Sequence, residues 1–140
     1  MTTLKDLDIR YPDLHLSLAR VRLPVGWVGI IEDAGRQIVQ ARRPGTIFES
    51  RQIKDRRGDH TELRWYYRLE SDAEVPEIAE RIEDIIAEAI AASRRTCQAC
   101  GHLGEPVRQG RWGLVLCPEH ARRFLAGARP GDVVEYVDEE

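Results

Sequence analysis

The chain has 140 residues, 42% of them hydrophobic and 32% charged, and its formal net charge is −3. This length predicts one main domain with its own core, and a net charge so close to neutral gives no whole-molecule signal for nucleic-acid binding. No apolar run is long enough to span a membrane, and the polar N-terminus and few cysteines lead us to expect a cytoplasmic protein.

The first forty residues predict a strand followed by a helix. Leu14, Leu16 and Leu18 alternate with His15 and Ser17, which is typical of a half-buried strand with His15 on its exposed side, although a helix competes here. The next apolar residues follow helical spacing and predict an amphipathic helix from Trp27 to about Ala41. They are Trp27, Ile30, Ile31, Ala34, Ile38 and Ala41.

Residues 46–70 read as a β-hairpin. The segment from Thr61 to Glu70 has the clearest period-2 pattern of the chain, and a polar turn from Asp55 to His60 precedes it. Arg51, Arg64 and Arg68 would then share an exposed face with Tyr66. Such a face is either the solvated side of a two-layer sheet or a surface for single-stranded nucleic acid.

A second amphipathic helix is expected at about residues 75–92. Its isoleucines and alanines recur at helical spacing, and acidic residues in its first turn favour the helix dipole. Charge alternates in blocks along the chain, since basic residues dominate 36–68 and acidic residues dominate 70–88. Blocks of this kind indicate either packing between complementary segments or a basic face for an acidic or phosphate-bearing partner.

The most specific motif lies between residues 97 and 120. Cys97-x-x-Cys100 is followed by sixteen residues and then by Cys117-x-x-His120. Two ligand pairs at this spacing are typical of structural zinc sites, and four protein ligands close the coordination sphere of one ion. The sequence therefore predicts one structural Zn²⁺ held by Cys97, Cys100, Cys117 and His120.

A redox Cys-x-x-Cys pair and a disulfide are the alternatives to a metal. A redox pair normally opens a helix after a strand, whereas this pair precedes a glycine-rich loop, and three cysteines cannot all pair within one chain. His102 is a possible substitute ligand, but Cys117-x-x-His120 completes the pattern without it.

The segments around the ligands predict a treble-clef-like zinc finger. Residues 107–116 read as a small hairpin with a glycine-rich turn, and Pro118 suits the first turn of a helix that carries His120 and ends near Gly127. We expect an α+β protein in which a small antiparallel sheet, the hairpin 46–70, packs with two amphipathic helices. Its expected parts are an α+β domain over 1–93, a zinc-finger lobe over 94–126, and a tail over 127–140 that adds a short strand or docks before an acidic end.

Several of these motifs together resemble an uncharacterised family of small bacterial and prophage-encoded, zinc-finger-like proteins. The resemblance spans nearly the whole chain and implies a zinc-bearing α+β protein without implying an activity. This chain departs from the family pattern at Lys54–Asp59. The matching residues are Tyr11-Pro12, Gly26-Trp27-Val28-Gly29-Ile30-Ile31, Leu63-Arg64-Trp65-Tyr66, Thr96-Cys97-Gln98-Ala99-Cys100-Gly101, Trp112-Gly113 and Leu116-Cys117-Pro118-Glu119-His120.

Three functions compete. The first is a zinc-stabilised protein-interaction module, an accessory, inhibitor or immunity-type protein associated with a mobile element, with a protein partner. The second is nucleic-acid binding through the basic hairpin face and the finger helix, with Arg51, Arg64, Arg68, Arg111 and Arg122 as contacts.

The third function is a treble-clef nuclease, and it is the weakest because no catalytic spacing joins its candidate residues. They are His60, His102, Asp55, Asp59 and Glu105. We therefore predict a protein that is not an enzyme and has no catalytic residues.

Overall fold

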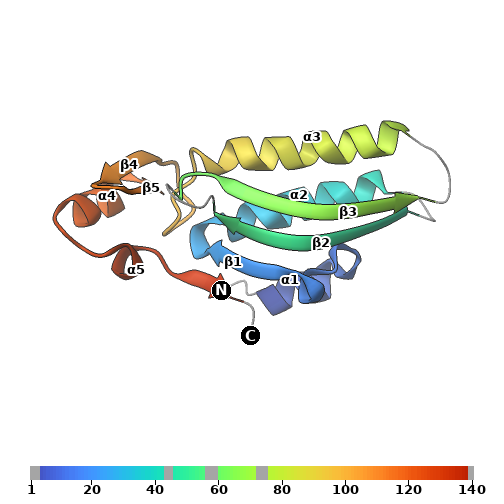
Figure 1. The fold of residues 1–140 in the computed structure, drawn as a ribbon, viewed down its shortest axis with the longest axis horizontal. Helices are drawn as coiled ribbons and strands as arrows, with labels where there is room; N and C mark the ends of the chain where they lie inside the picture. The colour runs from blue at the N-terminus through green and yellow to red at the C-terminus, as the bar shows by residue number, and fades with distance from the viewer. Residues whose placement is uncertain (1–3, 43–45, 56–59, 72–75, 139–140) are drawn as a thin grey trace.

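A four-stranded mixed sheet lies at the centre of the fold (Figure 1). The computed structural model describes residues 4–42, 46–55, 60–71 and 76–138. The strands lie in the order β3-β2-β1-β6, with β1 and β2 parallel and the other neighbours antiparallel. Their bounds are β1 Arg20–Pro24, β2 Thr46–Asp55, β3 Leu63–Ser71 and β6 Tyr136–Asp138.

The α+β class is confirmed, but the expected small antiparallel sheet is wrong in extent and in pairing. The predicted hairpin forms β2 and β3, whereas β1 and β6 extend the sheet on the β2 side. Parallel strands need a crossover connection, and helix α2 (Val28–Ala41) supplies it between β1 and β2. The two added strands span five and three residues, too few for a clear alternation in the sequence.

Helix α2 lies behind β2 and β3 in Figure 1, and α3 (Pro76–Ser93) packs against both α2 and β3. Both predicted helices are thus found. Their apolar rows meet strand residues such as Phe48, Ile53 and Trp65 in the main core. The buried helix residues include Ile31, Ala34 and Ile38 from α2 and Ile78, Ile82, Ile85, Ile86 and Ala89 from α3.

The strand predicted over Leu14–Leu18 is wrong. Helix α1 (Leu4–Arg10) is followed by two 3₁₀ turns, η1 (Pro12–Leu14) and η2 (Leu16–Leu18), and the strand begins at Arg20. Between the turns His15 has a left-handed backbone with φ of 53°, and this reversal sends both Leu14 and Leu16 into the core. His15 is not an exposed strand residue either, because it is half-buried with Nδ1 2.8 Å from the carbonyl oxygen of Phe48.

The C-terminal third forms a lobe at one end of the sheet. It contains the hairpin β4 (Glu105–Gln109) and β5 (Trp112–Leu116), helix α4 (Pro118–Leu125) and the short helix α5 (Pro130–Val133). A second apolar cluster lies here and includes Cys97, Leu114, Phe124 and Val133. The tail then returns as β6 beside β1. The division of the chain at residues 93 and 126 stays a prediction.

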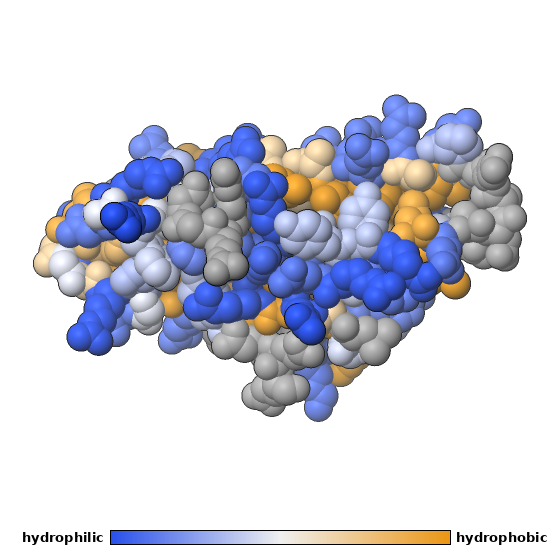
Figure 2. All heavy atoms as spheres, viewed as in Figure 1, coloured by the Kyte–Doolittle hydropathy of each residue, from blue (hydrophilic) through white to orange (hydrophobic). Residues whose placement is uncertain are grey.

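The second face of the sheet is turned toward the viewer in Figure 1, where β2 and β3 lie in front of α2. We call it the open face. Alternation along the strands and the pairing register place Arg20, Arg22, Gln52, Lys54, Arg64 and Tyr66 on it. Hydrophilic side chains cover much of this view (Figure 2).

Candidate metal centre

The side chains of Cys97, Cys100, Cys117 and His120 converge on one point of the C-terminal lobe. One ligand atom from each lies within 4.8 Å of all the others. Sγ of Cys100 lies 3.8 Å from Sγ of Cys117, and Nδ1 of His120 lies 3.7 Å from Sγ of Cys97 and 3.1 Å from Sγ of Cys117. Two sulfurs bound about 2.3 Å from one tetrahedral ion lie roughly 3.8 Å apart, so these separations fit a shared metal.

A tight turn after α3 places the first two ligands. The N–H of Gly101 donates to the carbonyl of Cys97 over 2.8 Å, and the N–H of Cys97 donates to the carbonyl of His102 over 2.7 Å. Gly101 has φ of +82°, a conformation that glycine adopts without the strain a Cβ would bring.

The other two ligands lie at the start of α4. Cys117 is the N-cap residue with an extended backbone, and Pro118 occupies the first turn, where a missing N–H costs no hydrogen bond. His120 follows within the first turn, so its ring meets the thiol of Cys117 directly. The spacing Cys-x-x-His thus reflects a helix start, as the sequence predicts.

The main domain holds the first ligand turn through Gly26, Trp27 and Gln98. The N–H of Gly26 donates to the carbonyl of Gln98 over 2.8 Å, and the indole Nε1 of Trp27 donates to the carbonyl of Thr96 over 2.9 Å. The fully buried Gln98 exchanges bonds with Val115 of β5: its N–H donates over 2.8 Å, and its Oε1 accepts from the Val115 N–H over 2.6 Å.

From the sequence, Trp27 is expected on a helix face, and Gly26 and Gln98 are named only as part of the family pattern. Only the Gly-Trp pair of the family pattern hinted that this segment matters. The contacts join residues far apart in the chain, which no local pattern reports.

The thiols of Cys100 and Cys117 lie in different electrostatic environments. Desolvation and the neighbouring Cys97 and Cys117 thiols raise the pKa of Cys100 to about 11. Desolvation also acts on Cys117, but hydrogen bonds from the backbone and ring of His120 and from the other two thiols outweigh it and lower the pKa of Cys117 to about 7. Cys100 therefore needs a bound metal ion to be a thiolate near neutral pH.

All four predicted ligands come together, and the three cysteines are free thiols rather than a disulfide. The cluster could bind a metal ion. His102, considered as a substitute ligand, is exposed and lies outside the group.

The predicted contact arginines of the hairpin have acidic neighbours. Arg51 lies 3.5 Å from Glu49, Arg64 lies 3.1 Å from Glu62, and Arg68 pairs with Glu49 over 3.0 Å and also with Glu70. The hydrogen bond and charge of Arg68 lower the pKa of Glu49, and Arg51 adds to this effect. Arg111 is exposed at the β4–β5 turn and Arg122 is exposed on α4. Both are far in sequence from the β2–β3 hairpin.

The nuclease candidates form no metal-ligating group within the described part of the chain. His60 Nδ1 lies 3.0 Å from Oδ2 of Asp55, but its ring stacks on Trp112 with centroids 4.2 Å apart, and the same Asp55 oxygen accepts a 2.7 Å bond from the Tyr136 hydroxyl. These contacts tie β2 to the lobe and to β6. Asp59 lies outside the described residues.

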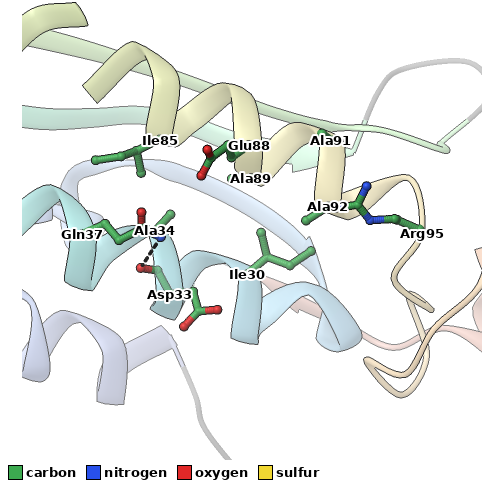
Figure 3. A pocket seen from close by; sticks show the side chains of 10 residues that line it. All are labelled: Ile30, Asp33, Ala34, Gln37, Ile85, Glu88, Ala89, Ala91, Ala92 and Arg95. Atoms are coloured by element: carbon green, nitrogen blue, oxygen red, sulfur yellow. Dashed lines mark hydrogen bonds between the residues drawn. The ribbon is translucent and has the colours of Figure 1, made fainter. Parts of the chain in front are cut away.

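A groove of about 420 Å³ lies between α2 and α3 (Figure 3). Aliphatic and small side chains such as Ile30, Ala34, Ile85 and Ala89 line it, with Asp33, Glu88 and Arg95 as its charged groups. The lining contains no histidine, cysteine or serine, so it offers no nucleophile with an adjacent base.

Comparisons of this chain with protein-family models, curated proteins and solved structures return no match. The family resemblance therefore stays a prediction. Among the described residues, every helix is too short or too polar to cross a bilayer.

Proposed function

We propose that the cluster binds one structural zinc ion in a treble-clef-like lobe, and that the chain is an interaction module of the accessory or inhibitor type. Three thiolates and one imidazole are a donor set that zinc prefers, and four protein ligands leave no position for a catalytic water. The order of turn, hairpin and ligand-bearing helix supports the treble-clef assignment. In this proposal zinc folds the lobe, and other surfaces bind the partner.

A row of unneutralised carboxylates on α3 carries the proposal of a protein partner. Glu77, Glu80, Asp84 and Glu88 recur at three- and four-residue intervals, which places them on one exposed side of the helix. We call them the acidic row. In the described residues none of the four forms an ion pair, in contrast to the hairpin acids Glu49, Glu62 and Glu70, which all do.

Such a row favours a basic protein surface as its partner. Like charges at helical neighbours repel each other and lower helix stability slightly, so an opposing row of lysines or arginines would relieve a cost already present in the free chain. The groove between α2 and α3 runs beside the row, with Glu88 common to both. An apolar side chain of the partner can enter it while the basic residues meet the carboxylates.

Purification of the tagged full chain from the cells that encode it tests this proposal. After nuclease treatment, we expect one protein to remain bound to the wild type and to be lost from Glu80→Gln/Asp84→Asn. The control Glu105→Gln/Glu135→Gln removes the same charge from other exposed positions and should retain the protein. Absence of any bound protein, or equal retention by both double variants, would refute the interaction module.

Nucleic-acid binding is a second candidate, and a different observation favours it. The open face gathers cations, whereas the acidic row lies on the helix layer behind the sheet (Figure 1). A basic stripe on one face is the electrostatic feature that nucleic-acid-binding domains share even when the whole chain is near neutral.

A further inference from the structure

Three cations stand side by side across the open face. Arg22 on β1 is the register partner of Lys54 on β2, and Lys54 is the register partner of Arg64 on β3. We call these three residues the cation row. Neighbouring strands lie roughly 4.8 Å apart, so three positive charges share a short line across the sheet.

This arrangement disfavours the free fold, because like charges directly opposite each other on adjacent strands repel. Arg64 has Glu62 3.1 Å away, and Arg22 lies over the Tyr136 ring at 4.3 Å and has Asp138 of β6 as its register partner. Within the described part of the chain, the ammonium of Lys54 has neither an ion pair nor a hydrogen bond, and the same holds for the nearby guanidinium of Arg20. An anionic ligand would neutralise this row.

The cations surround a hollow of about 290 Å³ on the open face. Its lining consists of Arg20, Val21, Arg22, Gln52, Lys54, Asp55 and His60. Asp55 is buried, and its carboxylate already accepts the hydrogen bond of the Tyr136 hydroxyl. The charged groups of the lining are therefore three cations and one carboxylate that already accepts a hydrogen bond, and Gln52 adds an amide.

An aromatic ring lies in the adjacent row of the sheet. Tyr66 is the register partner of Gln52, two residues along the strands from the Lys54–Arg64 pair, and 51% of its surface is exposed. A ring in this position offers a flat surface for stacking beside the cations that would hold phosphates. Duplex bases are stacked on each other and present no free face, whereas unpaired bases do.

We propose that the open face binds single-stranded nucleic acid, with phosphates along Arg20, the cation row and the hollow, and one base stacked on Tyr66. The inference rests on the second candidate function and assigns it to residues other than the predicted contacts. Of those contacts only Arg64 belongs to the site, because it alone is in register with Lys54, whereas Arg68 is the register partner of Glu49 and Arg51 lies 3.5 Å from Glu49.

The test is fluorescence anisotropy with labelled oligouridylate and oligothymidylate of about a dozen nucleotides, using the zinc-loaded full chain. Between about 50 and 200 mM salt, one phosphate contact from each of the four cations predicts that log K falls against log salt with a slope of about −3. Lys54→Gln should weaken binding and move the slope toward zero by about 0.7. Tyr66→Ala should weaken binding roughly 5- to 150-fold at constant salt slope.

Arg81→Gln is the matched control, since it removes one positive charge from α3 and should leave affinity and slope unchanged. Tighter binding of the uridylate would indicate RNA, and tighter binding of the thymidylate DNA; either supports the inference. It is overturned if neither binds at low salt, or if Lys54→Gln behaves like Arg81→Gln. Equal binding of a polyglutamate peptide, insensitive to Tyr66→Ala, would overturn it in favour of an acidic protein surface.

Failure of this inference and failure of the interaction module can be told apart. The titration measures oligonucleotide binding by the purified chain alone, whereas the co-purification measures bound protein after nucleic acid has been digested. Zinc content and circular dichroism of each variant establish that it is folded. A folded chain that binds oligonucleotide but no protein refutes the module alone, and the reverse result refutes the open-face site alone.

Discussion

Gly26 lies so close to Cys97 that a side-chain carbon on Gly26 would stand 2.1 Å from the carbonyl oxygen of Cys97. The same hypothetical carbon would lie 2.7 Å from the carbonyl carbon of Gln98. Both obstacles are backbone atoms of the turn that carries the first two ligands. The main domain and the metal centre are therefore packed through a contact that only glycine permits.

Replacing this glycine, which is not a ligand but touches the ligand turn, is predicted to disturb the metal centre. Gly26→Ala must displace the ligand turn or η3 (Val25–Trp27), and we expect a loss of about 2 kcal/mol or more in the free energy of unfolding, with weaker metal retention. Chemical denaturation and metal analysis measure both effects. Gly29→Ala on α2 is the control, because nothing lies within 4 Å of its added carbon and alanine should stabilise the helix by about 0.5–1 kcal/mol. Equal behaviour of the two variants would contradict the close contact.

The two histidines of the lobe are predicted to differ sharply. His120→Ala removes a ligand whose Nδ1 lies 3.1 Å from the Cys117 thiol, so the variant should lose most of its zinc affinity. His102→Ala changes an exposed residue outside the cluster and should bind zinc as the wild type does. Competition with a chromophoric chelator compares the affinities. Weakened zinc binding by His102→Ala together with unchanged zinc binding by His120→Ala would show that the wrong histidine has been assigned as the ligand.

Zinc binding is predicted to release protons at neutral pH. The pKa of Cys100 is raised to about 11 without metal, so its thiol is protonated at pH 7 and must lose its proton to ligate zinc. The stability that zinc adds is therefore present at neutral pH and is lost as the pH falls and protons compete for the ligands. Calorimetric titration of metal-free protein in buffers of different ionisation enthalpy counts the protons. A reaction enthalpy independent of the buffer would contradict thiolate ligation by initially protonated cysteines.

The cation row is predicted to lower the free energy of unfolding and to raise the affinity for oligonucleotides. Lys54→Glu places a carboxylate between Arg22 and Arg64, so cross-strand repulsion becomes attraction, and we expect a gain of about 0.2–1 kcal/mol in the free energy of unfolding. The same variant should bind oligonucleotides least of all. Denaturation and anisotropy on one preparation test both halves. A destabilised Lys54→Glu would mean that the cations do not repel each other in the free chain.

Local patterns in the sequence predict the elements that are long or chemically distinctive. The two helices have repeated apolar rows over about four and five turns. The β2–β3 hairpin alternates over most of its length, and the four ligands stand at a spacing set by a turn and a helix start. Each of these features depends on neighbours within a few residues. The structures of these segments therefore follow from local geometry.

Features that depend on distant partners escape the same reasoning. The Leu14–Leu18 alternation comes from two turns joined at His15. Neither the identity of this residue nor the apolar pattern around it predicts a left-handed backbone. The cation row exists only because β1 joins β2 in parallel at one particular register. Arg20 and Arg22 were consequently absent from the expected contacts, while Arg51 and Arg68, prominent in the sequence, have acidic neighbours.

The most direct test of the central claim is thermal unfolding of the purified chain before and after removal of metal by a strong chelator, with metal content measured on the same sample. The account predicts one zinc per chain, lost on chelation together with a large drop in the unfolding temperature of the C-terminal lobe, because structural zinc contributes roughly 10–16 kcal/mol of apparent binding free energy in small zinc-binding peptides. An unchanged unfolding temperature after complete metal removal, or a purified chain that is folded and binds no zinc, would contradict a structural metal centre.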